Sequence, residues 1–489
     1  MAGRRNTDKV VKNPTFMADI RYFFEDPDIR CMNDELEDFD LSTYEGVRSN
    51  ASRIFRQTLP PRGKMPPQKD RKWSEARSES FLNWINNESP RGVPFSRPVP
   101  KEPVSPTARV RKDIRDLDKD ELKLLKDAFD GIIQREPDEP NSYFQVAAIH
   151  GIPDREYCLH HEMGFHPWHR AYLLRMENAL RSVPGCGEVT LPYWDISGTV
   201  PAVLFKEPFA SFTLPRRVGA EFPEGFVTVR NERTDVQRQL RTYRMADKIH
   251  ESLQENYWET FNDSIEGRHD SGHGICGETI SDADVTAYDP MFWFFHCNWD
   301  RLWWRWQHRV DATTLNRFKS TLLDSSRWLE PPVNDLEPFD GATTDGVIDV
   351  SELHYALSRD DRPFEPAETG FGNIIASTSF RLSLSRKVSV RVKGIKRLNI
   401  PGSFKVSLLA DGKLVDWEGF FQSTAPKRCT TCRQKDIVNI DFKVDLEKIK
   451  DKTLSVTVDL VSAKRAHTRV SLKKIGNPTI NVRQLLVEG

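Results

Sequence analysis

One stretch constrains this chain more than any other: Ala287 to Gln307, AYDPMFWFFHCNWDRLWWRWQ. A helix so rich in aromatic residues is hydrophobic nearly all round, so it must be buried. Its single histidine, His296, then needs a hydrogen-bond acceptor or a metal ion. The preceding segment RHDSGHG holds His269 and His273, which fall on one face of a helix about one turn apart. Both rings can reach a single ion, which predicts a metal site in a helical core.

Other interpretations of these histidines exist. A His-x-x-x-His pair alone is often a zinc site or a chance surface pairing, and a lone buried histidine is usually a hydrogen-bonded core residue. The glutamate of the His-Glu-x-x-His zinc hydrolases is missing, because Asp270 follows His269 directly.

A second histidine cluster upstream favours the metal site. The segment from Ala147 to Tyr172 holds five of the twelve histidines in the chain: His150, His160, His161, His166 and His169. Two sites with three histidines each are therefore available. Three neutral imidazoles suit copper, iron or zinc and leave positions open for a small ligand such as dioxygen.

These segments resemble the two copper-binding regions of the type-3 copper family, which comprises tyrosinases, catechol oxidases and molluscan-type haemocyanins. The resemblance covers roughly residues 110 to 310. The motifs that carry it are Cys158-Leu159-His160, Trp168-His169-Arg170, Leu191-Pro192-Tyr193-Trp194-Asp195, and Asp289-Pro290 through Asn298, Asp300 and Arg301.

The resemblance implies two copper ions as the cofactor and O2 as the co-substrate. It assigns His150, His160 and His169 to the first copper, and His269, His273 and His296 to the second. It also implies a thioether between Cys158 and His160. His161 and His166 have no counterpart as ligands, so we expect them beside the site or at the surface. Phe295 stands where many relatives have histidine.

Further residues are expected to support the chemistry. Asp270, where many tyrosinases have asparagine, is a candidate base for the phenol proton, together with Glu259. The alternative is that Asp270 only orients His269 through a hydrogen bond. Three residues near His296 are expected to fix it by hydrogen bonds: Asn298, Asp300 and Arg301.

Composition and charge exclude several classes of protein. The 71 basic and 72 acidic residues nearly cancel, so neither nucleic acid nor an anionic membrane is an implied partner. An uncharged apolar run of about 18 residues is absent, and the basic start lacks the apolar core of a secretory signal. Seven cysteines in 489 residues fit a reducing compartment or a processed form whose leader has been removed. We therefore expect a soluble, cytoplasmic protein.

The chain divides into four segments, which together predict a multidomain α+β protein. Residues 1–88 form a small helical module with a faint resemblance to cytochrome c-like modules. The haem motif Cys-x-x-Cys-His is absent, so a structural or oligomerising appendage is expected instead. Residues 89–110 form a proline-rich linker, and residues 111–340 the dicopper domain, expected as a four-helix bundle. Within residues 341–489, apolar and polar residues alternate in short segments, which predicts an antiparallel β-sandwich. The expected strands begin at Phe380, Val388, Phe404, Ile437, Leu454 and Val470.

Similar β domains cover the copper site in fungal tyrosinase precursors and molluscan haemocyanins. Phe420 or Phe421 is the expected plug at the substrate position, although both are equally compatible with a core role. The pair Cys429 and Cys432 is implicated in copper delivery by the same resemblance, and alone its spacing also suits a disulfide or part of a zinc site.

The predicted function is therefore a tyrosinase that ortho-hydroxylates small phenolic substrates and oxidises o-diphenols to o-quinones. The alternatives are a catechol oxidase without monophenolase activity and a haemocyanin-like O2-binding protein. The sequence leaves open whether the substrate is a phenol or an aminophenol, whether the β domain is removed, and whether the chain forms a homo-oligomer.

Overall fold

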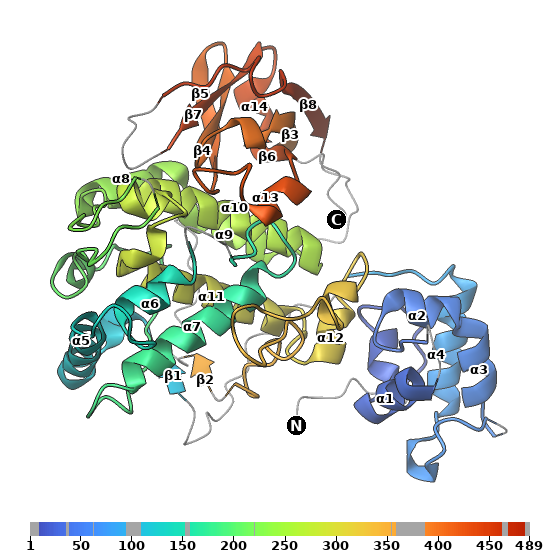
Figure 1. Cartoon of the computed structure of the whole chain (residues 1–489). Helices are drawn as coiled ribbons and strands as arrows, with labels where there is room; N and C mark the ends of the chain where they lie inside the picture. Colours follow the sequence, from blue (N-terminus) through green and yellow to red (C-terminus); the bar gives the residue numbers. More distant parts are fainter. Residues whose placement is uncertain are drawn as a thin grey trace.

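The chain folds into a helical amino-terminal module, a larger helical unit and a β domain that sits on it (Figure 1). The computed structural model describes residues 9–35, 39–61, 63–93, 109–151, 157–219, 221–353, 355–357, 387–461 and 468–484. The predicted α+β class, with a helical core and carboxy-terminal antiparallel sheets, is confirmed.

The amino-terminal module has its own aromatic core, in which Phe24, Trp73, Phe81 and Trp84 pack edge to face or tilted. Its helices are η1 (Ile20–Phe23), α1 (Asp26–Glu35), α2 (Tyr44–Ser49), α3 (Ala51–Thr58), η2 (Lys69–Arg71) and α4 (Glu75–Asn86). The module contacts the helical unit through Arg21, which donates to Ser320 Oγ at 2.9 Å and to the Val310 carbonyl at 2.8 Å.

The helical unit surrounds the predicted metal site with α7, α10 and α11. Its main elements are β1 (Arg109–Arg111), α5 (Lys119–Ile133), α6 (Tyr143–Ala148), α7 (Phe165–Arg181), α8 (Arg233–Tyr243), α9 (Met245–Leu253), α10 (Trp258–Cys276), α11 (Met291–Arg309), α12 (Leu315–Lys319) and β2 (Tyr355–Leu357). Short 3-10 helices connect them: η3 (Ile114–Asp116), η4 (Ala202–Phe205), η5 (Glu278–Ser281), η6 (Thr286–Tyr288) and η7 (Arg327–Leu329). Within the described residues, no helix is both long and apolar enough to span a bilayer.

The predicted helical core is confirmed, although two of the six predicted ligands lie outside its helices. His169, His269, His273 and His296 lie on α7, α10 and α11, but His150 follows the end of α6 and the turn before α7 carries His160. Three helices and two connections therefore present the histidines.

The predicted domain boundary at residue 340 is too early. Strand β2 pairs in parallel with β1, and Tyr355 OH donates to Asp300 Oδ2 at 2.6 Å inside the helical unit. This unit therefore extends to Leu357. Its first strand begins at Arg109, just before the predicted start at 111.

The β domain is a sandwich of two three-stranded antiparallel sheets, ordered β6-β3-β8 and β5-β4-β7. Its elements are β3 (Lys387–Lys396), η8 (Arg397–Asn399), β4 (Phe404–Ala410), β5 (Lys413–Phe420), α13 (Thr430–Gln434), β6 (Ile437–Asp445), α14 (Leu446–Ile449), β7 (Leu454–Leu460) and β8 (Thr479–Gln484). The expected strand at Phe380 lies outside the described residues. Strands β5 and β8 were not predicted.

Strand β5 presses against α10 with almost no space between the two backbones. At Gly419, an added Cβ would lie 2.8 Å from the Ser271 Cα and 2.9 Å from the Asp270 carbonyl oxygen. The Gly419 N–H donates to Ser271 Oγ at 2.8 Å. Only glycine fits here, so this position fixes how deeply the β domain sits on the helix that carries two of the histidines.

A buried charge, Glu418, anchors the same contact. Its Oε1 accepts from Lys248 Nζ at 2.7 Å and from Arg268, and its Oε2 accepts from Tyr243 OH. Burial opposes ionisation of this carboxyl, but Arg268 and Lys248 outweigh burial and lower the pKa of Glu418. The carboxylate therefore remains charged, and it stabilises the seated β domain.

We predict that Glu418→Gln loosens the β domain. The change leaves two buried cations without their shared anion, and breaking a buried ion pair costs about 3–5 kcal/mol. Hydrogen exchange at the β5 amides and the free energy of unfolding measure the effect. Asp441→Asn is the control, because Asp441 pairs with Arg391 at the exposed surface of the same domain and should change both quantities much less.

The wild type should also show an acid dependence. Because the pKa of Glu418 is lowered in the folded state, its contribution is complete above its ordinary pKa of 4.5 and is lost as pH falls through the folded-state pKa. The facing groups Tyr243, Lys248, Arg268 and Asp416 stay in place in the variant. An equal acid-induced rise in β5 exchange in Glu418→Gln would assign the effect to another group.

Candidate metal centre

Helices α10 and α11 bring three imidazoles to one point. His269 and His273 lie one turn apart on α10, and their Nε2 atoms are 2.8 Å apart. His296 Nε2, from α11, lies 3.3 Å from both. Helix α11 starts where it does because Asp289 Oδ1 accepts the Met291 N–H at 2.9 Å. All three rings are buried, so their nitrogen atoms converge away from water.

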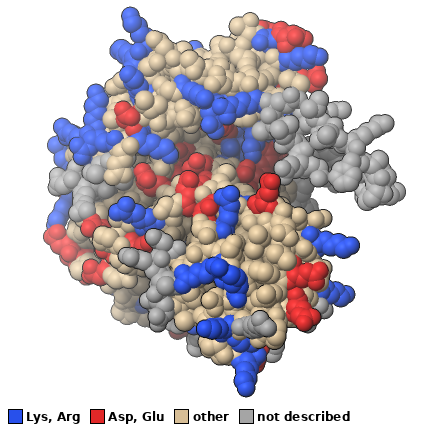
Figure 2. All heavy atoms as spheres, turned by 90° about the vertical axis from the view of Figure 1, so that its right-hand side faces the viewer, with Lys and Arg blue, Asp and Glu red and all other residues tan. Residues whose placement is uncertain are grey.

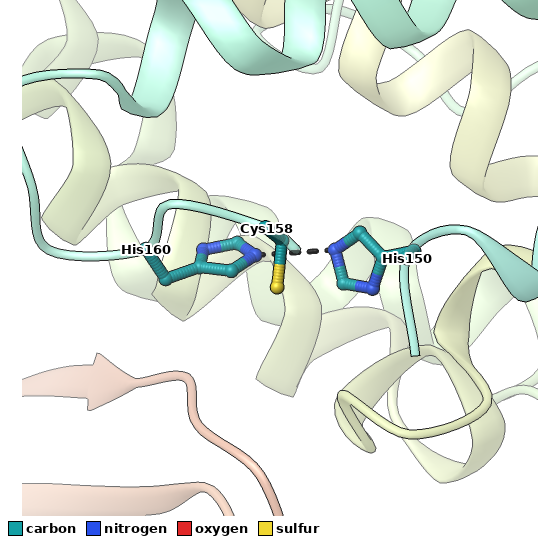
Figure 3. Close-up of side chains that lie close together, drawn as sticks. All are labelled: His150, Cys158 and His160. Carbon is teal, nitrogen blue, oxygen red and sulfur yellow. Dashed lines mark hydrogen bonds between the residues drawn. The ribbon is translucent and has the colours of Figure 1, made fainter. Parts of the chain in front are cut away.

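The other three predicted ligands lie on the opposite side of His296. His150 and His160 face each other, with 3.2 Å between their Nε2 atoms, and the Cys158 Sγ lies beside them, within 4.8 Å of a ring nitrogen of each (Figure 3). The His169 ring centroid lies 5.0 Å from that of His160 and 5.7 Å from that of His150. His169 also stacks on His296 at 4.4 Å, which places the two trios side by side.

The hydrogen bonds of the rings leave their Nε2 atoms available. Four rings direct Nδ1 at an acceptor: His150 at the Ala283 carbonyl (3.3 Å), His169 at the Phe165 carbonyl (2.8 Å), His273 at the Ile280 carbonyl (2.6 Å) and His269 at Asp270 Oδ1 (2.9 Å). An Nδ1–H donated in this way places the Nε2 lone pair toward the centre.

Protonation does not compete for these nitrogen atoms. Burial lowers the pKa of all six imidazoles, to about 3 for His150 and His273. His169 Nε2 is buried without a hydrogen-bond partner among the described residues. Neutral imidazoles in two converging groups, with unused lone pairs directed inward, fit a pair of copper ions.

Residues 140–309, which contain all six of these histidines, match the family described as the common central domain of tyrosinase. The chain contains a tyrosinase central domain. This domain belongs to the type-3 copper family, and the trio His269, His273 and His296 and the pair His150 and His160 fit the dicopper centre that this family binds.

The relatives of this chain include tyrosinases and haemocyanins. A tyrosinase of Aspergillus oryzae is 23% identical over 454 residues, covering 63% of this chain and 82% of the relative. Hemocyanin 2 of Megathura crenulata is 28% identical over 225 residues, which cover 42% of this chain and only 6% of that protein. A solved tyrosinase structure from Burkholderia thailandensis superimposes with a TM-score of 0.59 at 20% identity, covering 77% of this chain and all of that one. The last comparison shows the shared fold.

Asp270 of the tyrosinase central domain has both carboxylate oxygens engaged. Oδ1 contacts His269 Nδ1 at 2.9 Å, and Oδ2 accepts the Phe421 N–H at 2.9 Å. Burial raises the pKa of Asp270 well above its ordinary value. The orienting contact with His269 is therefore present, and the catalytic role stays a prediction.

Glu259 does not join the site. Its two oxygens accept the N–H groups of Leu323 (2.9 Å) and Asp324 (3.1 Å). Glu259 lies in the first turn of α10, more than two turns from His269.

Besides Asp270, the carboxyl that reaches the histidines is Glu266, which was not predicted. Its Oε1 accepts the His161 N–H at 2.6 Å and lies 3.6 Å from His160 Nδ1. Its position one turn before Asp270 on α10 was the available signal.

The expected hydrogen bonds from Asn298, Asp300 and Arg301 to His296 are wrong. His296 Nδ1 has no hydrogen-bond partner among the described residues. Arg301 Nη1 donates instead to Asn298 Oδ1 at 3.1 Å. Asp300 accepts from Arg170 Nε (2.6 Å) and Arg111 Nη1 (3.0 Å), so it ties α11 to α7 and β1.

Of the two expected plug residues, Phe421 reaches the histidines. Its ring stacks on His273 with centroids 3.9 Å apart and also lies 5.0 Å from His160. Phe420 stacks on His161 at 4.0 Å and on Phe404 at 4.9 Å, so it lines the base of the β domain.

Cys429 and Cys432 lie behind Phe420. Cys432 Sγ accepts from Arg397 Nη2 at 3.0 Å, and the Arg397 guanidinium lies over the Phe420 ring at 4.8 Å. Cys429 Sγ accepts the Cys432 N–H at 3.1 Å at the start of α13. Copper delivery by this pair stays a prediction.

The remaining expectations concern three aromatic neighbours. His161 lies beside the ligands, against Glu266 and Asp270. His166 is buried between Trp258, Phe261 and Trp303, away from the centre. Phe295 packs edge-on against His273, with 4.7 Å between the ring centroids. An apolar ring therefore stands at the position where many relatives have a histidine.

We predict that His169→Ala lowers copper binding from two ions per chain to one. The change removes an inward lone pair from the first trio and leaves the second trio complete. Elemental mass spectrometry after gel filtration measures the number of copper ions per chain. His166→Ala is the matched control, because His166 lies on the same helix and is equally buried; two coppers in both variants would remove His169 from the ligand set.

Proposed function

We propose that this protein is a dicopper phenol oxidase of the tyrosinase type. It uses O2 to hydroxylate monophenols at the ortho position and to oxidise o-diphenols to o-quinones. The observation that carries this proposal is the convergence of six buried, neutral imidazoles in two adjoining trios. When bound, the copper pair supplies dioxygen binding and two-electron chemistry, and the chain supplies ligand geometry, a proton acceptor and access.

The position of Phe421 supports a phenolic substrate. Its ring lies parallel to His273, with 20° between the planes, and it is fully buried. A phenol has the same six-membered ring with one added oxygen. We propose that the substrate takes this position when Phe421 withdraws, with its hydroxyl directed at the copper centre.

The same withdrawal would free a proton acceptor. Asp270 Oδ2 loses the Phe421 N–H, while Oδ1 keeps its contact with His269. We propose that Oδ2 then accepts the phenol proton. Burial raises the pKa of Asp270 and of nearby Glu266, which makes protonation of either carboxylate easier. Glu259 is not part of this proposal, since its oxygens hold the Leu323 and Asp324 amides.

An O2-binding protein is the second candidate. The seated Phe421 closes the centre to phenols, as a carrier requires, and haemocyanins are among the relatives. A catechol oxidase, active on o-diphenols alone, is the third.

Oxygen uptake by the copper-loaded chain tests these functions. We predict that Phe421→Ala raises uptake with a monophenol and with a catechol by tenfold or more over wild type, because it opens the substrate position. Phe421→Leu is the control, because a leucine side chain is larger than that of alanine and still fills much of the substrate position. Uptake with catechol alone would indicate a catechol oxidase. Failure of every variant with both substrates, despite two bound coppers, would indicate an O2 carrier.

Cys158 should become covalently linked to His160. Its sulfur lies in one cluster with the ligand nitrogens of His150 and His160. We propose that a bond forms between Sγ and a His160 ring carbon, with the two displaced hydrogens passing to O2. The intact mass should fall by two hydrogens after copper loading in air. Cys158→Ala should lose this change and Cys186→Ala should keep it, whereas an unchanged wild-type mass would rule out the link.

A further inference from the structure

A second group of ligand atoms lies beside the histidine trios, on the side of the β domain. It consists of His161, Glu266 and Asp270, each offering one ligand atom, with those atoms all within 4.8 Å of one another. We propose that these three side chains form a third metal site, for a divalent first-row transition-metal ion, and that this site fills only when Phe421 withdraws. It uses none of the six histidines assigned to the copper pair.

The donor atoms have the spacing and chemistry of a metal site. His161 Nε2 lies 3.7 Å from Asp270 Oδ2, a separation that two ligands about 2.1 Å from one ion can have. One ligand atom of each of the three side chains lies within 4.8 Å of the other two. One imidazole with two carboxylates suits copper(II), zinc(II) or iron(II), and among the divalent ions copper(II) binds most tightly.

The two carboxylates have no Lys or Arg side chain at ion-pair distance among the described residues. Glu266 and Asp270 side chains are only 3% and 2% exposed. Among the described residues, their close ion-pair partners are histidines and not Lys or Arg. Two buried carboxylates side by side are unfavourable without a counter-charge. His160 Nδ1 is also buried, has no hydrogen-bond partner, and lies 3.6 Å from Glu266 Oε1.

An ion can reach this group from the surface. A cavity of about 490 Å³ between α10 and the β domain is lined by all three side chains. Asp and Glu side chains gather in the hollow beneath the β domain on the face shown in Figure 2. The cavity walls include the acids Glu255, Asp263 and Asp441, alongside the cations Arg391, Lys435 and Lys443.

Two of the three ligands also hold the backbone of the plug. His161 Nε2–H donates to the Phe421 carbonyl at 2.8 Å, and Asp270 Oδ2 accepts the Phe421 N–H at 2.9 Å. A metal ion bound to His161 Nε2 takes the place of the proton that this nitrogen donates to the Phe421 carbonyl, and one bound to Asp270 Oδ2 competes with the Phe421 N–H for that oxygen. Metal binding therefore breaks the first of the two bonds that seat Phe421 and weakens the second.

This competition makes the two events thermodynamically reciprocal. Whatever loosens the β domain tightens the third site, and a metal ion in the third site loosens the β domain by the same factor. The site therefore offers a metal-dependent release of Phe421 that needs no cleavage of the chain, and an ion that stays on Asp270 Oδ2 blocks this oxygen from accepting the phenol proton.

Electron paramagnetic resonance tests the site in the full-length, copper-loaded protein. A lone Cu(II) ion has an unpaired spin and gives a signal, whereas two bridged Cu(II) ions pair their spins and are silent. On titration with Cu(II), the wild type should bind one ion beyond the pair, with a signal of matching intensity. His161→Phe should lose this ion and its signal while keeping the pair, because phenylalanine preserves stacking on Phe420 and removes both nitrogen donors.

Three further variants complete the test. Glu266→Gln should weaken the extra site by about tenfold or more, and Glu418→Gln should strengthen it by loosening the β domain. Asp263→Asn is the matched control, since Asp263 lines the same cavity outside the trio. Bound Cu(II) should also raise hydrogen exchange in β5 of the wild type but not of His161→Phe.

Clear outcomes would overturn the proposal. It fails if neither the wild type nor Glu418→Gln binds copper beyond the pair. It also fails if the extra signal persists in both His161→Phe and Glu266→Gln. These results do not depend on oxygen uptake, so the phenol oxidase function stands or falls separately.

Discussion

The centre depends on one requirement: six imidazoles in an apolar core must remain neutral and must keep their Nε2 lone pairs directed inward. Burial secures neutrality by lowering the pKa of every ring. The direction of the lone pairs is set by hydrogen-bond acceptors at the Nδ1 atoms of four rings. Three of these acceptors are backbone carbonyls, those of Phe165 in α7, Ile280 and Ala283. Because a backbone carbonyl cannot be changed by substitution, the path of the chain around the site sets much of the ligand geometry.

A buried ionic network gives this arrangement its rigidity. Asp300 on α11 accepts from Arg170 on α7, Arg111 on β1 and Tyr355 on β2. Burial opposes ionisation of Asp300, but Arg170 and Arg111 outweigh it and lower its pKa. The network thereby joins segments far apart in the sequence, and it holds His169 and His296 in register, since their helices can hardly slide without separating buried charges.

Much of the site could be predicted from the sequence, for physical reasons. Histidines four apart and a histidine within an aromatic helix have few stable environments, so spacing and burial pointed to His269, His273 and His296. The choice of His150, His160 and His169 rested on the family resemblance. The partners of Asp300 could not be predicted, because proximity along a helix suggested His296, whereas Arg111 lies 189 residues away. Pairings between distant segments leave no local pattern.

The two missed features of the β domain contact have a common origin. Strand β5 escaped prediction because its sequence, KLVDWEGF, alternates apolar with polar residues only from Val415 to Glu418. Its acids face Lys248 and Arg268 of the helical unit instead of water. Glu266 was overlooked because a carboxyl on a helix is usually solvated. This one is buried, next to the cavity between α10 and the β domain.

Asp270 contacts both Phe421 and His269, and these two contacts link the position of the β domain to the electron-donating strength of His269. Its carboxylate shares charge between the Phe421 N–H and the imidazole of His269. Once the N–H departs, that charge is concentrated on His269, and the ring becomes a stronger electron donor. A stronger donor favours the more oxidised state of the ion it holds, so lifting the β domain would shift a reduction potential as well as open a path.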